Sequence, residues 1–302
     1  VTIARSRKHI QKYYDTKDIG SFPKRRIPIS KRPGLTDLKT TVNYKDIAEV
    51  LSSLNLAIYT PSDFIQDSKI FKYTDKYDAK HVRGGLTQSG REKGIRRLMA
   101  INLMKRLESS VHSFNLTLKR INELITETIN KIDNFEKNKM NETLALEDFS
   151  DMDLDGDDMD DDRFVIGRKV QIDIEDMDYI SWRYALARDK EYLDLLISLV
   201  DDIRPKHDIK LQTLYELIDE KQRHPINPEN KKILIFTAFA DTADYLYENV
   251  SKYVKDKYQL ETALITGTTE GKTTLKSAKK DLNAILTLFS PISKGKDIIF
   301  PN

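Results

Sequence analysis

Apolar residues recur at steps of three and four over residues 107–135, and this run constrains the fold of the 302-residue chain more than any other feature. The spacing is that of an amphipathic α-helix and predicts one long helix, from about residue 92 to about residue 138. Such a stripe has to be covered by a partner helix, so we expect an antiparallel helical arm. Residues 189–203 and 208–220 have the same spacing and are the two candidates for the partner.

The last part of the chain, residues 223–302, follows a different pattern. Short apolar, β-branched runs predict buried strands, and apolar residues at helical spacing predict helices between and after them. The expected strands are 232–236 and 260–266, and the expected helices are 241–255 and 273–289. Strand, helix, strand and helix in this order predict a parallel sheet with right-handed crossovers. Leu234 and Leu264 should then lie on neighbouring parallel strands.

Charge is distributed unevenly, although the net charge is only +2. Residues 1–40 carry eleven basic and three acidic side chains, and residues 76–106 carry nine and two. Residues 147–178 carry fourteen carboxylates and three basic side chains. The basic segments should attract polyanions, and we expect an acidic disordered loop over about 141–178. A further hypothesis is that this acidic loop competes with a nucleic acid for the basic surfaces.

The chain contains no cysteine, which excludes disulfides, thiol nucleophiles and zinc–thiolate sites. It is also compatible with a reducing compartment, so a cytoplasmic location is the default expectation. The longest strongly apolar run, 233–239, is far shorter than the roughly 20 residues of a membrane-spanning helix. We therefore expect no membrane partner.

Two segments partly match ligand-binding motifs. Residues 267–273, Gly-Thr-Thr-Glu-Gly-Lys-Thr, resemble a phosphate-binding P-loop but are one residue short, and Glu270 stands where a phosphate would lie. A strand-to-helix turn, or backbone amides that bind a nucleic-acid phosphate, are the alternatives. Residues 151–162 match much of a calcium loop, but Asp162 replaces the final glutamate, so a disordered acidic loop is the alternative. The five histidines have no metal-ligand spacing.

Three stretches near the C-terminus carry a family resemblance: residues 232–246, 263–267 and 288–291. They look like the start of the second RecA-like lobe of superfamily II helicases of the Swi/Snf type, especially bacterial helicase-like proteins. Near the N-terminus, residues 5–10 and the following Phe22-Pro23 resemble the stretch that closes the first lobe of that family. The family carries helical insertions between these two parts, and the predicted helical arm would be one of them.

The resemblance implies a mostly α fold with a C-terminal α/β piece, in which a long helical-hairpin insertion precedes a partial RecA-like parallel sheet. It divides the chain into the end of the first lobe and a linker (1–75), the helical insertion with its acidic loop (76–222), and the first half of the second lobe (223–302).

The family binds ATP and Mg²⁺ through a P-loop and an Asp-Glu box, and it completes the site with late arginines; this chain contains none of these motifs. The resemblance therefore implies a central fragment of an ATP-dependent helicase that does not hydrolyse ATP alone. Its implied partners are DNA, or alternatively RNA, and the remaining helicase lobes. If the protein is bacterial, a nucleoid-associated location follows.

The same resemblance assigns residues that would contact a nucleic-acid backbone. They lie at the ends of the expected strands and in the basic N-terminal stretch: Thr237, Thr242, Thr266, Gly267, Lys272, Arg5, Arg7 and Lys8. Hydroxyls, amides and cations there would bind phosphates without reading bases. For Thr242 a helix cap is the alternative role. We assign no catalytic, cofactor-binding or metal-binding residue.

Two other functions remain open. One is a non-catalytic coiled-coil interaction module with a small α/β domain, which would bind protein and show no salt-sensitive binding to DNA. The other is a nucleotide-binding regulator that uses residues 267–273.

Overall fold

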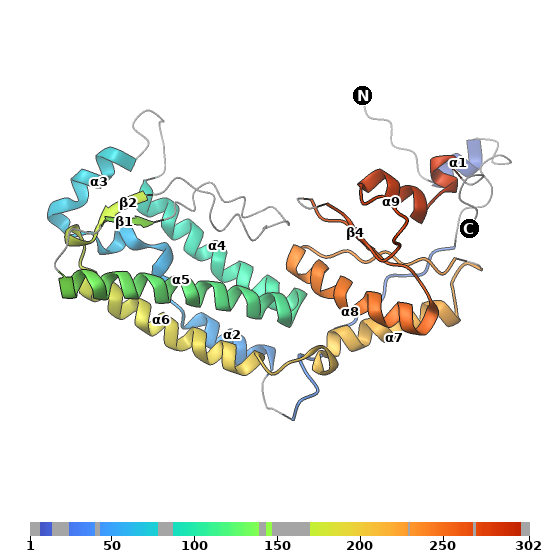
Figure 1. The fold of residues 1–302 in the computed structure, drawn as a ribbon, viewed down its shortest axis with the longest axis horizontal. Coiled ribbons are helices and arrows are strands. Elements are labelled where there is room, and N and C mark those ends of the chain that lie inside the picture. Colours follow the sequence, from blue (N-terminus) through green and yellow to red (C-terminus); the bar gives the residue numbers. More distant parts are fainter. Residues whose placement is uncertain are drawn as a thin grey trace.

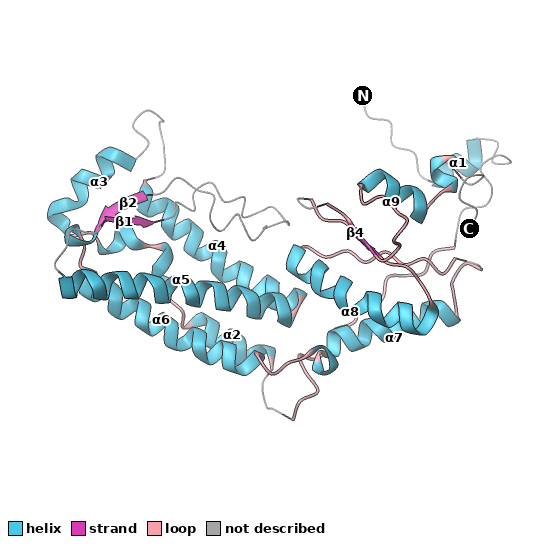
Figure 2. Ribbon diagram, in the orientation of Figure 1, coloured by secondary structure: helices cyan, strands magenta, loops and turns pink. Residues whose placement is uncertain are grey.

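The computed structural model describes residues 7–13, 24–39, 43–77, 87–138, 143–146, 170–228, 230–267 and 270–296. The described chain is mostly helical and forms two lobes that meet at an angle (Figures 1 and 2). The helical lobe contains α2 (Tyr44–Ser52), α3 (Ile70–Tyr77), α4 (Gln88–Ser109), α5 (Val111–Asn138) and α6 (Tyr179–Val200). The C-terminal lobe contains α7 (Ile209–Arg223), α8 (Ala240–Tyr258), α9 (Leu282–Phe289), β3 (Ala263–Leu264) and β4 (Lys272–Thr273). The short helix α1 (Arg7–Tyr13) lies at the same end of the molecule as α9 (Figure 1).

The stretch predicted as one long helix forms two helices, α4 and α5. Between them Ser110 is in an extended conformation, with φ −159° and ψ 134°. Its backbone N–H donates to the carbonyl of Arg106 at 2.8 Å, and its side-chain oxygen accepts from the backbone N–H of His112 at 3.2 Å. Serine side chains compete with helical hydrogen bonds in this way and favour helix ends. The prediction of one helix over residues 92–138 is therefore wrong, because the chain folds back at Ser110.

Helix α6 covers α5 in the antiparallel arrangement that the apolar spacing predicts. Near the start of α5, the Asn115 side chain donates to Asp201, just beyond the end of α6, at 2.9 Å. At the other end, Arg183 of α6 donates to Asp133 of α5 at 2.5 Å. The prediction of residues 189–203 as the partner of the stripe is confirmed, and both helices contribute fully buried residues to the core, such as Leu118 and Ile125 of α5 and Leu186 and Leu193 of α6.

The other candidate, residues 208–220, forms most of α7 and packs elsewhere. It contributes Leu211 and Ile218 to a second, smaller core, to which α8 adds Tyr245, Val250 and Val254. The C-terminal lobe is therefore built on the pair α7 and α8. Of the two predicted partners of the α5 stripe, only the one that forms part of α6 packs against it.

The segment that follows α2 packs against α4 and α6. Trp182 of α6 is fully buried and donates its ring N–H to the carbonyl of Ala57 at 3.1 Å. The buried carboxylate of Asp189 accepts from the backbone N–H groups of Asn55 and Ala57, each at 2.7 Å. These bonds hold Leu56 at φ 51°, a left-handed conformation that is costly for a residue with a Cβ atom. One core therefore includes the predicted linker and the predicted helical insertion.

The ends of the predicted acidic loop are ordered. Strand β1 (Thr143–Leu146) pairs antiparallel with β2 (Val170–Asp173), and Ile172, Ile174 and Met177 enter the core of the helical lobe. The prediction of a disordered loop over 141–178 is therefore wrong at both ends. Alternating apolar residues from Val170 to Ile174 were the signal for a strand, and the surrounding carboxylates obscured it. The segment between the strands, with the calcium-loop prediction, lies outside the described residues.

A buried carboxylate fastens this region to α3. Asp176 is 1% exposed and accepts from Lys72 at 2.6 Å and from the hydroxyl of Tyr73 at 2.8 Å. Burial alone would raise the pKa of Asp176, but the hydrogen bonds from Lys72, Tyr73 and Lys69 outweigh it and lower the pKa to about 2. The carboxylate is therefore ionised at neutral pH and holds α3 against the chain after β2.

The predicted parallel sheet is not present in the described residues. The run 231–237 is extended but pairs with none of the described strands, and Leu234 and Phe236 are 64% and 88% exposed. Leu264 lies in β3, which pairs antiparallel with β4. The expected neighbouring parallel strands at Leu234 and Leu264 are therefore a wrong prediction. Closing the short loop between β3 and β4 costs less chain entropy than a crossover to the distant run. The following helix, α9, also begins later than predicted, at Leu282.

Gly271 allows this local pairing, because the chain passes close to it. A Cβ atom there would lie 2.4 Å from the carbonyl oxygen of Lys280 and 2.7 Å from Cδ1 of Ile285. We expect Gly271→Ala to lower the free energy of unfolding by about 1–3 kcal/mol, the usual cost of overpacking. Gly94→Ala is the control, since a Cβ atom there would meet no heavy atom within 4 Å and alanine favours the interior of α4 by about 1 kcal/mol. Opposite shifts of the two thermal midpoints are expected; equal midpoints would contradict the close approach.

Candidate nucleic-acid interface

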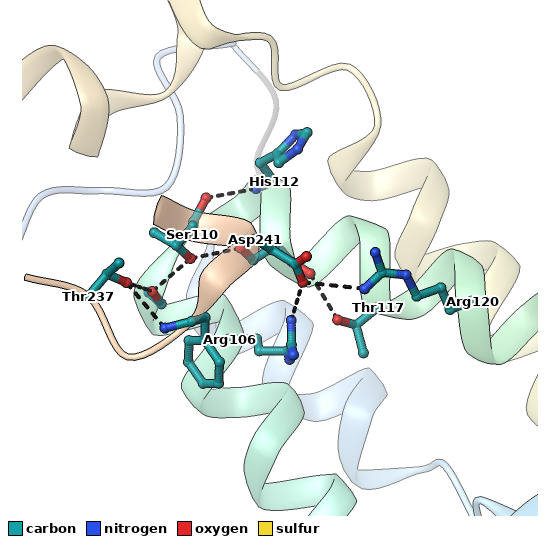
Figure 3. Close-up of polar contacts among 11 residues, drawn as sticks. Arg106, Ser110, His112, Thr117, Arg120, Thr237 and Asp241 are labelled. Carbon is teal, nitrogen blue, oxygen red and sulfur yellow. Dashed lines mark hydrogen bonds and ion pairs between the residues drawn. The ribbon is translucent and has the colours of Figure 1, made fainter. Parts of the chain in front are cut away.

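Two of the predicted contact residues lie where the two lobes meet. Thr242, in the first turn of α8, is 3% exposed, and its hydroxyl is 2.7 Å from that of Ser113 and 3.0 Å from that of Ser109. Thr237 is partly buried, and its hydroxyl is 3.3 Å from that of Ser109 (Figure 3). Both threonines therefore bond to the turn between α4 and α5. Thr242 is not available to a phosphate in this conformation, and its hydroxyl does not cap α8.

An ion-pair cluster lies next to these hydroxyls. Arg106 of α4 is 1% exposed, and its NH1 is 2.6 Å from Oδ2 of Asp241. Arg120 of α5 approaches the same oxygen at 3.3 Å, so both arginines point toward one carboxylate (Figure 3). The guanidinium of Arg106 also lies 4.7 Å from the centre of the Phe239 ring, a cation–π distance.

These groups form one structural unit, which we call the polar anchor: Arg106, Ser109, Ser113, Arg120, Asp241 and Thr242. It joins α4 and α5 of the helical lobe to the first turn of α8. Asp241 is well placed there because the N-terminus of a helix favours a negative charge. A buried pair of this kind is costly to break, so the anchor holds the start of α8 against α4 and α5.

A cleft of about 430 Å³ opens beside the polar anchor, between α7, the start of α8 and the extended run. Its walls are mainly apolar, and its cations are Lys31 and Lys210. Lys210 donates to the carbonyl of Glu108, and burial lowers the pKa of its amine. Asp208 accepts from the hydroxyl of Tyr245 at 3.0 Å and caps α7. The polar groups of the cleft are thus largely used by the fold, and the cleft does not resemble a phosphate site.

His112 stands at the edge of the same region and stacks on Tyr245, with the ring centres 4.6 Å apart. Loss of water around the imidazole lowers its pKa below the usual value of 6.5. The ring is therefore neutral at pH 7 and adds no positive charge for a polyanion.

The P-loop-like stretch does not form a phosphate cradle. Lys272 lies in β4 and makes an ion pair with Asp244 of α8, and no helix begins at Thr273. The predicted strand-to-helix turn at this point is therefore wrong. Thr266 and Gly267 precede residues 268–269, which lie outside the described residues. With the motif one residue short and its lysine paired, these residues do not fit ATP and Mg²⁺.

The basic N-terminal residues are separate from the polar anchor. Arg7 and Lys8 begin α1, at the far end of the C-terminal lobe (Figure 1), and Lys8 is exposed. Arg5 lies outside the described residues. The eight predicted residues therefore do not form one site: Thr237 and Thr242 belong to the lobe junction, and Lys272 is paired within the C-terminal lobe.

The arginines of the polar anchor were missed, although the sequence contains a signal for one of them. Arg106 follows Met99 and Leu103 at the steps that place all three on one face of α4, and that face is buried. A cation on an apolar stripe requires a buried partner, because burying an unpaired charge is expensive. The partner, Asp241, is 135 residues away, so only the folded structure identifies it.

Comparisons of this chain with protein-family models, with curated proteins and with solved structures gave no match. None of the helices in the described ranges combines the length and the hydrophobicity that a bilayer-spanning segment needs. The part of the chain that the structure describes also has no group of three or more His, Asp or Glu side chains placed to hold a metal ion.

Proposed function

We propose that this chain is the central part of an ATP-driven DNA translocase or helicase of the Swi/Snf type. In this proposal it supplies nucleic-acid backbone contacts and a helical insertion, while ATP and Mg²⁺ bind to motifs that the chain lacks. The remaining helicase lobes are its protein partners, and its location is the cytoplasm, or the nucleoid of a bacterium. RNA is the alternative substrate.

The observation that carries this proposal is the polar anchor. It attaches the helical lobe at Asp241 and Thr242, and Thr237 bonds to Ser109 of the anchor. All three residues lie within the stretch that resembles the opening motif of a second helicase lobe. When the lobes of a translocase move, an insertion moves with them only if it is firmly joined to one of them. Here the buried ion pair and the hydroxyl contacts join the helical lobe to the start of α8. The order of extended run, α8 and β3 is also the order of elements that opens such a lobe.

The exposed extended run is consistent with the same proposal. Leu234, Ile235 and Phe236 are 64%, 42% and 88% exposed, and Ile233 packs on the core of α7 and α8. A central strand of an α/β sheet is apolar on both faces because helices and neighbouring strands cover it. The proposal therefore requires neighbouring strands beside this run. It rests on the order of elements and on the anchor, since the predicted parallel sheet is not formed in the described residues.

The second candidate is a non-catalytic module that binds another protein. The same exposed run favours it, because an exposed apolar, strand-forming segment is a common docking site. The two candidates differ in what binds: the module would bind protein at the run and would show no salt-sensitive binding to nucleic acid.

Binding of fluorescently labelled duplex DNA, followed by anisotropy at 50 to 200 mM salt, separates the two. We expect the association constant of the 302-residue chain to fall about 100-fold over this range, as about four phosphate contacts would give. A peptide nucleic acid of the same sequence is the control, because it has no phosphates and should not bind. RNA of the same sequence tests the alternative substrate. Absence of binding to DNA and to RNA at 50 mM salt would overturn the proposed function.

A further inference from the structure

Helix α4 carries four exposed cations around the part of its surface that is not packed. They are Lys93, Arg96, Arg97 and Lys105, which we call the basic face. Lys93 and Arg97 lie one turn apart near its middle, and Arg96 and Lys105 lie on its two opposite flanks. The opposite side of the helix is buried in the core through Ile95, Met99 and Leu103. At a rise of 1.5 Å per residue, the basic face extends over about 18 Å of helix.

Three of these cations make no ion pair within the part of the chain that the structure describes. Lys93 makes an ion pair with Asp63 at 3.1 Å, but Arg96, Arg97 and Lys105 make no ion pair with any residue in the described ranges. The arginines on the packed sides of this lobe are paired, as the polar anchor shows. Helix α4 itself has only two carboxylates, Glu92, which is buried, and Glu108 in the last turn. Arg96, Arg97 and Lys105 are therefore available to an external anion.

We propose that the basic face of α4 is the surface on which this chain holds the phosphate backbone of a nucleic acid. The proposal rests on the proposed function and changes the place of contact, from the strand ends to the helical insertion. At the strand ends Thr242 is buried and Lys272 is paired. On α4, by contrast, guanidinium groups are exposed, and their planar donors match phosphate oxygens.

The composition of the face favours a nucleic acid over a membrane surface. A helix that lies in a lipid interface buries a broad apolar face, usually with aromatic residues, and keeps its cations on the opposite side. The apolar side of α4 is already buried in protein. Its exposed side has only two large aliphatic residues, Leu98 and Ile101, which are 41% and 47% exposed.

The test compares two triple variants of the full chain that lose the same charge. Arg96→Ala/Arg97→Ala/Lys105→Ala removes the unpaired cations, and alanine preserves the helix. Each lost phosphate contact lowers the salt slope by about one, so we expect it to fall by about 2–3 and affinity at 50 mM salt to fall at least about tenfold. The control is Lys131→Ala/Lys137→Ala/Lys252→Ala, which removes exposed cations of α5 and α8 and should bind like the wild type.

The binding results separate this inference from the proposed function. If the wild type binds DNA and the α4 variant binds it equally well, this inference is overturned. It is also overturned if both variants lose binding equally. In both cases the proposed function stands. No binding of DNA or RNA by the wild type overturns the proposed function as well. Binding only to vesicles that contain phosphatidylserine, lost in the α4 variant, identifies a lipid surface and overturns the assignment to nucleic acid. Far-UV circular dichroism confirms that both variants are folded.

Discussion

Replacing Asp241 with alanine is expected to lower the free energy of unfolding by about 3–5 kcal/mol, the usual cost of removing one partner of a buried ion pair. The substitution leaves Arg106, which is 1% exposed, without the carboxylate that binds it at 2.6 Å. The Nε atom of Arg106 already has no hydrogen-bond partner among the described residues, so the fold gives it little compensation. Urea unfolding followed by circular dichroism measures the loss.

The matched control removes both charges. In Arg106→Met/Asp241→Leu the buried pair is replaced by apolar groups, and we expect a stability within about 1–2 kcal/mol of the wild type. Arg120 is 28% exposed on its side chain and can turn toward water in this variant. A loss below about 1 kcal/mol for Asp241→Ala alone would show that the lobes are not held together by this pair. The anchor would then not join the insertion firmly to the C-terminal lobe, as the proposed function requires.

The helical part of this fold was predictable because its signals are local. The apolar spacing of α5 and α6 identifies both helices and their antiparallel packing, since covering one stripe requires another. The break at Ser110 was not predicted, because the apolar spacing continues across it from Leu107 to Val111. Only the adjacent pair Ser109-Ser110 marks it, and serine is tolerated in many helices.

The C-terminal lobe was predicted less well because strand pairing is not local. The run around Leu234 has the composition of a buried strand, but composition does not say which chain pairs with it. Leu264 instead pairs across a short loop with Lys272, where the cost of closing the chain is small. The predicted site failed for the same reason, since the parallel edge that would have gathered its threonines is not formed in the described residues. Thr242 was predicted to contact a nucleic-acid backbone or to cap a helix, but its hydroxyl instead lies against Ser109 of α4 and Ser113 of α5.

Replacing Trp182 with alanine is expected to cost about 3–5 kcal/mol of stability, the range for truncating a buried aromatic residue. Trp182 is fully buried, lies 6.3 Å from the Phe64 ring and donates to the carbonyl of Ala57 at 3.1 Å. Trp182→Phe is the control: it fills most of the cavity and loses the hydrogen bond, so about 1–3 kcal/mol is expected. Urea unfolding has to be followed by circular dichroism, because this is the only tryptophan of the chain.

The location of Trp182 gives the same substitution a second, local consequence. The bonds from Trp182 and Asp189 to residues 55–57 hold the segment with α2 against α6. Hydrogen exchange at Ala57, whose N–H is bonded to Asp189, should therefore accelerate in Trp182→Ala even well below the unfolding transition. In Trp182→Phe it should stay closer to the wild type, because the ring still packs. Unchanged exchange at Ala57 in the alanine variant would mean that Asp189 alone holds the segment, so that the segment is not one cooperative unit with the core of α6.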